Sequence, residues 1–273
     1  MHIYFFLWTD IGYAQHLQCG FQEQFKKSSQ NGFFTSEIDR ILKQPKKSQY
    51  TGYREKWIIP VVVHIVHFKS DELISDNKVL SQIEQLNRDF SGNNIDIINI
   101  PEIFKVFANR NSKINFCLAN VDIEGNSTSG ILRTETHLKQ IGTKGELYRT
   151  SLGGSDAWDT DKYLNIWVAD TGDFVTGFGT YPTQVSDDKH KQGVVVNSKY
   201  FDINDSKHFN LGRVVVHEVG HYLGLKHIWG DSENCISDDG VEDTPSQKHS
   251  YEGCPKSPQK SCTTEDMFMM NVW

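Results

Sequence analysis

Apolar residues fall into a few short segments separated by long polar ones, and their spacing predicts the secondary structure. Residues 57–68, WIIPVVVHIVHF, form a nearly continuous β-branched run of the kind found in buried strands. Ser75 is a candidate helix N-cap, and the apolar residues after it keep the helical period to about Phe90. Those residues are Val79, Leu80, Ile83, Leu86 and Phe90. We therefore predict a strand followed by an amphipathic helix.

Further segments have strand patterns. Residues 113–122 and 163–170 alternate, and their apolar faces consist of Ile114, Phe116, Leu118, Leu164, Ile166 and Val168. The glycine-rich segment 175–182, VTGFGTYP, ends at a proline and suits an edge strand, and residues 193–201 predict another strand. These strands surround two long helices without regular βαβ alternation, which predicts an α+β fold.

Composition excludes several functional classes. The 273 residues are enough for one large domain or two small ones, and 37% hydrophobic with 23% charged residues is typical of a soluble globular protein. The net charge of −7 argues against nucleic acid or an anionic membrane surface as a partner. No apolar run approaches the roughly 20 residues that a membrane span needs, so we predict no transmembrane segment.

The N-terminal residues have a different character from the rest. Residues 1–18 contain a short apolar stretch followed by small and polar residues, which fits a secretory signal segment. No Lys or Arg precedes that stretch, so a misassigned start or a buried strand stays open. Residues 19–56 are polar and lysine-rich, and we interpret them either as a pro-segment or as a flexible linker. The main folded domain is predicted from residue 57 to residue 273.

The segment 214–230, VVVHEVGHYLGLKHIWG, places polar residues inside an apolar run. In a helix His217 and His221 lie on one face, one turn apart, so that both imidazoles reach a single metal ion. Glu218 lies beside that ion without binding it, where a general base takes a proton from a metal-bound water. Chemistry at a metal is therefore predicted on this helix.

A straight helix would carry a third histidine about 15 Å past the first. Gly224 resolves this, because glycine adopts positive φ, ends the helix and lets His227 return to the same metal. Three neutral imidazoles and one open position are the arrangement of catalytic zinc. The alternatives are histidines aligned by chance and a closed structural zinc site. His64 and His67, by contrast, are expected to be packed or surface histidines.

The run HEVGHYLGLKH matches the HExxHxxGxxH signature of the metzincin metallopeptidases. The surrounding sequence resembles the pappalysin-type branch, in the segments IPVVVHIVH, INFCLANVD, GILRTETH, YLNIWVAD, GFGTYP, GVVVNSKYF and DDGVEDTPSQ. The resemblance implies a secreted zinc endopeptidase with His217, His221 and His227 as ligands and Glu218 as the base. It also implies a twisted mixed sheet with an active-site helix and a backing helix above a cleft, and a small irregular lower subdomain. The substrate, a protein or peptide, would bind as an extended strand along 175–182.

The same resemblance implies further features after the third histidine. Calcium is expected at the oxygen ligands Asp238, Asp239, Glu242, Asp243 and Thr244, the alternative being an ordinary acidic loop. Cys235 is expected to pair with Cys262, and Cys254 with a cysteine beyond residue 273. Cys19 resembles the pro-segment cysteine that caps the zinc in some zymogens, although a stray cysteine is the alternative. Cys117, in an apolar strand, is predicted to be a buried free thiol.

The end of the chain, DMFMMNVW at 266–273, departs from the family pattern of a tight methionine turn followed by a tyrosine. Asn271 would match the turn asparagine, and Trp273 would then occupy the methionine position; alternatively Met269 or Met270 serves in a shifted register. We therefore expect a sequence truncated at its C-terminus. Two other functions stay open: a zinc-binding pseudo-peptidase that only binds peptides, and a structural zinc domain.

Overall fold

We describe a computed structural model of the chain, which covers residues 56–70, 73–100, 102, 105, 111–172, 175–181, 188–203, 209, 211–230, 235–242, 244, 246–250 and 262. Several predictions concern residues outside these ranges. They are the signal segment 1–18, the pro-segment 19–55, which includes Cys19, the turn at 266–273, and the single residues Asp243 and Cys254. The last residue of the predicted pro-segment, Lys56, is described.

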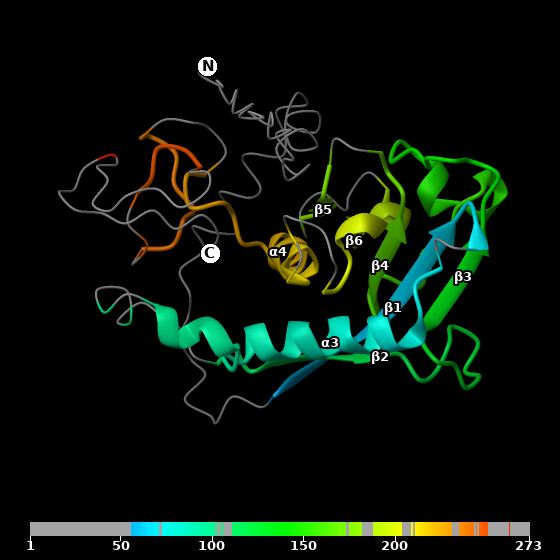
Figure 1. Cartoon of the computed structure of the whole chain (residues 1–273), viewed down its shortest axis with the longest axis horizontal. Coiled ribbons are helices and arrows are strands. Elements are labelled where there is room, and N and C mark those ends of the chain that lie inside the picture. Colours follow the sequence, from blue (N-terminus) through cyan, green and yellow to red (C-terminus); the bar gives the residue numbers. More distant parts are fainter. Residues whose placement is uncertain are drawn as a thin grey trace, which may run out of the picture.

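A six-stranded mixed sheet lies at the centre, in the order β2-β1-β4-β6-β5, with β3 also paired to β1 (Figure 1). The strands are β1 (Trp57–His67), β2 (Ile114–Leu118), β3 (Ile131–Glu135), β4 (Leu164–Ala169), β5 (Gly177–Gly179) and β6 (Val194–Asn197). The first half of β1 pairs with β2 and its second half with β3, both in parallel. Only β5 runs antiparallel to its neighbour within the described sheet, and it forms the edge beside β6. The edge strand predicted at 175–182 is therefore present.

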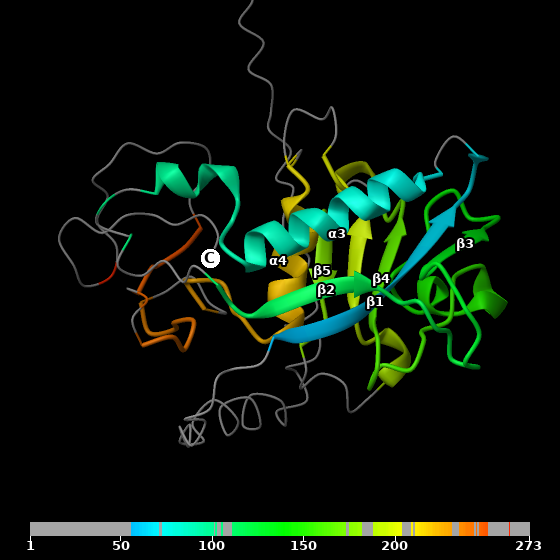
Figure 2. The same ribbon diagram turned by 90° about the horizontal axis from the view of Figure 1, so that it is seen from below.

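Two helices pack on one face of the sheet, α3 (Asp76–Phe90) and α4 (Arg213–Tyr222). Figure 2 shows α3 lying across the strands, with α4 at its side. The Ser75 side chain accepts a hydrogen bond from the Lys78 amide and caps α3 as predicted. Val79, Ile83 and Leu86 of α3 reach the core. The expectation for Leu80 is wrong: its side chain is 49% exposed, because it lies one residue round from the stripe that faces the sheet.

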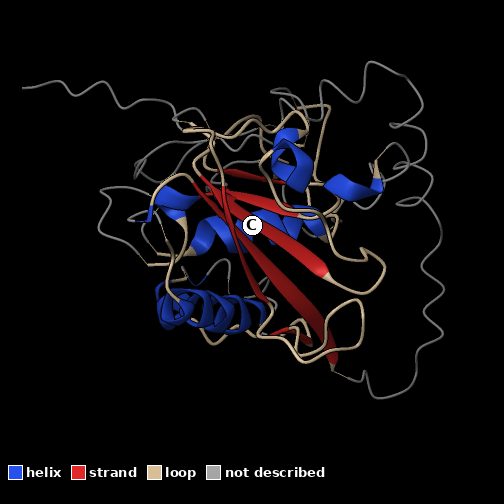
Figure 3. Ribbon diagram, turned by 90° about the vertical axis from the view of Figure 1, so that its right-hand side faces the viewer, coloured by secondary structure: helices blue, strands red, loops and turns tan. Residues whose placement is uncertain are grey.

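The opposite face of the sheet is covered by connecting segments that include the short 3₁₀ helices η4 (Glu146–Tyr148) and η5 (Thr150–Leu152). Figure 3 shows helices on both sides of the strands. Trp167 of β4 packs edge-to-face against Tyr148, and its indole N–H donates to the Ser155 carbonyl. His64 is fully buried and forms hydrogen bonds with Ser155 and Asn165, so it is a packed histidine as expected.

Two predictions about burial are wrong. Cys117 is free but exposed, because strand alternation points Phe116 into the core and Cys117 to the other face of β2, an outer strand of the sheet. Trp57 and Ile58 begin β1 but are 70% and 63% exposed, and the fully buried part of this long strand starts only at Val61. The α+β prediction is confirmed. Within the described ranges, no helix is long and apolar enough to cross a bilayer.

Candidate active site

Helix α4 carries the first part of the site, and its end is set by a glycine. Gly224 has a φ of 98°, its amide donates to the His221 carbonyl, and the Leu225 amide donates to the Gly220 carbonyl. This pair of bonds is the Schellman cap, which satisfies the last carbonyls of a helix and reverses the chain. The reversal predicted at Gly224 is therefore present, and it returns the chain toward the helix just before His227.

The turn brings the three predicted histidines together. The Nε2 atom of His217 lies 3.2 Å from Nε2 of His221 and 3.3 Å from Nε2 of His227. One ligand atom from each histidine lies within 4.8 Å of the other two, an arrangement that could hold a metal ion. Nitrogen atoms this close fit a shared cation better than three separate side chains.

Neighbouring groups fix the orientation of two of the rings. Nδ1 of His221 lies 2.8 Å from the Leu225 carbonyl, and because a carbonyl only accepts, the proton must sit on Nδ1. The lone pair of its Nε2 is then available inside the cluster, which is the tautomer that a metal ligand needs. The His227 ring stacks on Trp229, with centroids 4.5 Å apart and planes inclined by 6°.

Burial also sets the charge of the cluster. It lowers the pKa of His227 to about 4 and, with the repulsion of His227, the pKa of His221 to about 3. The pKa of His217 is lowered in the same way, first by burial and then by the two other histidines. The three imidazoles are therefore neutral at pH 7, as metal ligands must be. A donor set of three neutral imidazoles fits zinc.

Glu218 is completely buried, on the side of α4 that faces the edge strand β5. A Cβ atom on Gly177 would lie 3.0 Å from Glu218 Cγ and 3.3 Å from Oε1, and one on Gly179 would lie 2.2 Å from the Glu218 carbonyl oxygen. Only glycine allows strand and helix to approach so closely. The sequence analysis used the glycines only as signs of an edge strand and missed this close contact.

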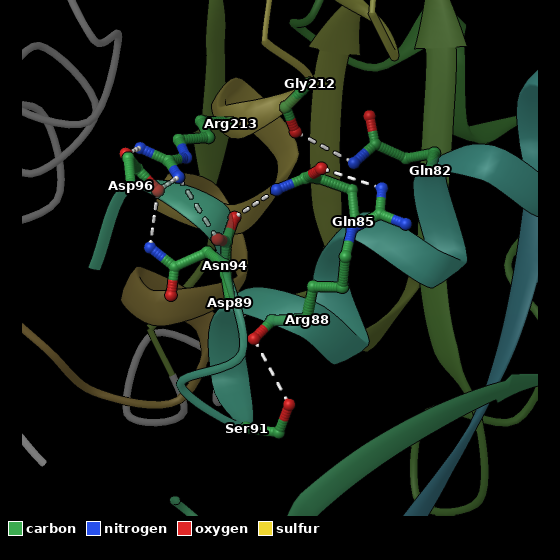
Figure 4. A network of polar contacts seen from close by, with 9 residues as sticks. All are labelled: Gln82, Gln85, Arg88, Asp89, Ser91, Asn94, Asp96, Gly212 and Arg213. Atoms are coloured by element: carbon green, nitrogen blue, oxygen red, sulfur yellow. Dashed lines mark hydrogen bonds and ion pairs between the residues drawn. The ribbon is translucent and has the colours of Figure 1, made fainter. Parts of the chain in front are cut away.

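A polar network holds the start of α4 against α3 and the 3₁₀ helix η2 (Ile95–Asn99), as Figure 4 shows. Arg213 forms two hydrogen bonds of 2.6 Å with the carboxylate of Asp96 and lies 3.4 Å from Asp89. The Gln82 side chain donates to the Gly212 carbonyl at 2.8 Å and accepts from the Asp202 amide. Sequence reasoning missed this network, because each of these bonds joins two residues more than 100 positions apart.

Four of the five predicted calcium ligands, Asp238, Asp239, Glu242 and Thr244, lie in a described segment after the third histidine. In Figure 1 this segment (orange) lies on the side of α4 opposite to β1 and β4. Asp238 accepts a hydrogen bond from the Gly240 amide and Asp239 one from the Val241 amide. Burial raises the pKa of Asp239, and the Thr244 side chain opposes that shift by donating to the carboxylate. Glu242 is exposed. The four residues therefore share one short segment, within which Asp239 and Thr244 are in contact.

A disulfide joins Cys235, just before this turn, to Cys262. It is the pair that the family resemblance implied. The bond ties residue 262 to the segment that follows the third histidine, and it closes a loop with a sequence separation of 27 residues.

Comparison with known proteins extends these observations. Residues 150–273 match the family model described as pregnancy-associated plasma protein-A. An extracellular metalloprotease of Arthroderma gypseum is 26% identical over 227 residues, which are 81% of this chain and 66% of that protein. The chain thus spans about two thirds of the length of this relative.

Solved structures give closer matches. Mature mirolysin of Tannerella forsythia, in complex with a cleaved peptide, is 38% identical with a TM-score of 0.76, covering 80% of this chain and 83% of that one. A mutant of promirolysin from the same organism is 34% identical with a TM-score of 0.78, covering 89% and 80%. The match thus extends over most of both chains. The chain therefore belongs to the pappalysin-type metzincin metallopeptidases, the family described by pregnancy-associated plasma protein-A.

Proposed function

We propose that this chain is an extracellular zinc endopeptidase that uses His217, His221 and His227 as zinc ligands and Glu218 as its general base. The observation that carries the proposal is the convergence of three neutral imidazoles beside a buried glutamate. Structural zinc sites are closed by a fourth protein ligand, usually a cysteine or histidine. Within the described residues, the cluster contains three ligands, which leaves a coordination position for the reaction.

The residues of the chain divide the chemistry among them. Zinc, when bound, supplies a Lewis acid that polarises the scissile carbonyl and lowers the pKa of water. The Glu218 carboxylate accepts a proton from the attacking water and then delivers it to the departing amine nitrogen. The Leu225 carbonyl keeps His221 in the tautomer that binds through Nε2. Hydrolysis is complete when the amine leaves and the second fragment carries the new carboxyl group, which keeps the second proton of the water until it ionises to solvent.

The substrate class follows from the edge of the sheet. β5 ends the strand order and lies against Glu218, so a peptide added beside β5 would lie next to the general base. An extended peptide that pairs with the backbone of an edge strand gains hydrogen bonds that do not depend on its side chains. The cleaved peptide bound by mirolysin supports a peptide substrate here. We propose that proteins or peptides bind antiparallel to β5.

Several finer features belong to the same proposal. Relatives named extracellular metalloproteases and the disulfide between Cys235 and Cys262 support secretion, because disulfides persist in oxidising compartments. A catalytic domain from residue 57, a preceding pro-segment and zinc capping by Cys19 stay predictions. Calcium in the turn 238–244 is proposed from its oxygen ligands, and its test is an increase in melting temperature on calcium addition.

The test compares the zinc-loaded chain with Glu218→Gln on unfolded casein. Both proteins should bind one equivalent of zinc, and the variant should cleave about 100- to 10,000-fold more slowly, because it lacks the base. Chelation should stop cleavage by the unmutated chain, and added zinc should restore it. Equal cleavage by both proteins would refute the role of Glu218. One equivalent of zinc with no cleavage by either would favour the peptide-binding alternative.

A further inference from the structure

Tyr181 lies two residues after the end of β5, and its ring lies beside His221 of the histidine cluster. Its side chain is buried, and its hydroxyl donates a hydrogen bond of 3.0 Å to the Leu225 carbonyl. Its ring lies edge-on to the His221 ring, with centroids 6.0 Å apart and planes inclined by 68°. The tyrosine therefore contacts both His221 and the carbonyl that orients it.

The Leu225 carbonyl is a junction between two parts of the site. It accepts from Tyr181 and also from Nδ1 of His221, at 2.8 Å. A carbonyl oxygen has two lone pairs, so both bonds can form at once. The edge strand is thus linked to a histidine of the cluster through one shared oxygen.

Packing of its own side chain does little to hold Leu225 in place, since that side chain is 43% exposed. The residue follows Gly224, whose positive φ lies in a region that glycine enters without steric cost. Hydrogen bonds fix the position: the Leu225 amide donates to Gly220, and the carbonyl accepts from Tyr181. The tyrosine hydroxyl therefore restricts the rotation of the peptide unit that carries the acceptor for His221.

We propose that Tyr181 is a positioning residue for the metal centre: it holds the Leu225 carbonyl so that His221 keeps the tautomer and ring angle needed to bind zinc. The inference rests on the proposed zinc site. It also gives the edge strand a second role, because the strand that is to pair with substrate then aligns a metal ligand. Removing a group that orients a histidine ligand typically weakens metal binding by about 10- to 100-fold. Tyr181 bonds the Leu225 carbonyl, which in turn bonds His221, so its removal should have a smaller effect.

The chain offers a matched control for testing the role of the Tyr181 hydroxyl. Tyr163 also donates its hydroxyl to a carbonyl, that of Val121, at 3.0 Å, and it is not part of the histidine cluster. Tyr181→Phe and Tyr163→Phe each remove one oxygen atom and one bond of the same kind. The zinc dissociation constant is measured for both by competition with a chromophoric chelator, and the unfolding of the zinc-free chains is measured in parallel.

Zinc should bind about three- to tenfold more weakly to Tyr181→Phe and within twofold of normal to Tyr163→Phe. The visible spectrum of the cobalt-substituted chain should change in the first variant only. A merely structural tyrosine would destabilise the zinc-free chain and leave the zinc affinity of the folded protein unchanged, which would overturn the inference. Failure of the unmutated chain to bind zinc would instead refute the proposed function.

A second measurement needs no variant and covers the case in which Tyr181→Phe does not fold. Nitrogen-15 histidine spectra of the zinc-loaded chain should show a proton on Nδ1 of His221 that exchanges slowly with water, because the shared carbonyl holds it. Rapid exchange of that proton would contradict the proposal.

Discussion

Replacing Arg213 by methionine should loosen the helix that carries the active-site residues. Arg213 forms two 2.6 Å hydrogen bonds with Asp96, and it lies one helical turn before His217. The side chains of Arg213 and Asp96 are 39% and 38% exposed, so solvent screens their attraction. The ion pair should therefore contribute about 1 kcal/mol to stability, the upper end of the range for surface pairs. Asp89 is more buried, at 10% exposure, and it would lose its contact with Arg213 in the variant, but it would still accept the hydrogen bond from Gln85. We expect a loss of about 1–2 kcal/mol in the free energy of unfolding.

The same ion pair should give this loss a pH dependence. Hydrogen bonds from Arg213 lower the pKa of Asp96 well below its ordinary value of 3.8. A carboxylate with a lowered pKa stabilises the fold fully above its unfolded pKa, and the contribution is lost as pH falls further toward the folded pKa. The difference between the unmutated chain and Arg213→Met should therefore be constant above about pH 5 and shrink below about pH 4.

The assay is urea unfolding of the zinc-free chain in a double-mutant cycle of Arg213→Met and Asp96→Asn. The coupling energy between the two sites should be about 1 kcal/mol at pH 7. The control cycle uses Lys162 and Asp159, an ion pair of 3.0 Å with 72% and 38% exposure, for which a smaller coupling energy is expected because solvent screens it more strongly. Coupling at Arg213 no larger than in the control, or a loss that persists unchanged at pH 3, would refute the reasoning.

Three further predictions concern the strand, the helix end and the disulfide. Gly179→Ala should cost about 1–3 kcal/mol of stability and much of the peptidase activity, because its Cβ would lie 2.2 Å from a carbonyl oxygen of α4; unchanged thermal melts and unchanged activity would contradict this. Gly224→Ala, at a φ of 98°, should cost about 1–2 kcal/mol by urea unfolding and weaken zinc binding by displacing the third histidine; unchanged zinc affinity would contradict this. Replacing Cys235 and Cys262 together by serine should cost up to about 3.5 kcal/mol for a sequence separation of 27 residues, and equal melting temperatures with and without reductant would contradict it.

The features predicted correctly from sequence depend on short-range geometry. His217 and His221 are four residues apart on a helix, and Gly224 alone permits the turn that returns His227 to them. Ser75 likewise caps the helix that begins at the next residue, by accepting a bond from an amide only three residues away. Such spacings fix the local backbone almost independently of the rest of the chain, so residue spacing alone is enough to predict the histidine cluster.

The features that were missed or wrong depend on distant parts of the chain. Tyr181 meets the Leu225 carbonyl only because β5 lies against α4, and Arg213 meets Asp96 across 117 residues. The apolar pattern of β2 could not show which of its faces packs against α3, so it could not show that Cys117 is exposed while Phe116 is buried. Periodicity identifies a face that can be buried, and tertiary packing decides whether it is.

The central claim is that three imidazoles hold a reactive zinc, and zinc-edge X-ray absorption tests it most directly. The sample is the zinc-loaded chain carrying Cys19→Ser, so that a capping thiolate cannot contribute. The account predicts one zinc per chain with three nitrogen ligands at about 2.0–2.1 Å, one further light atom and no sulfur. A sulfur shell at about 2.3 Å, or one equivalent of zinc that stays bound after His217, His221 and His227 are all replaced by alanine, would contradict it.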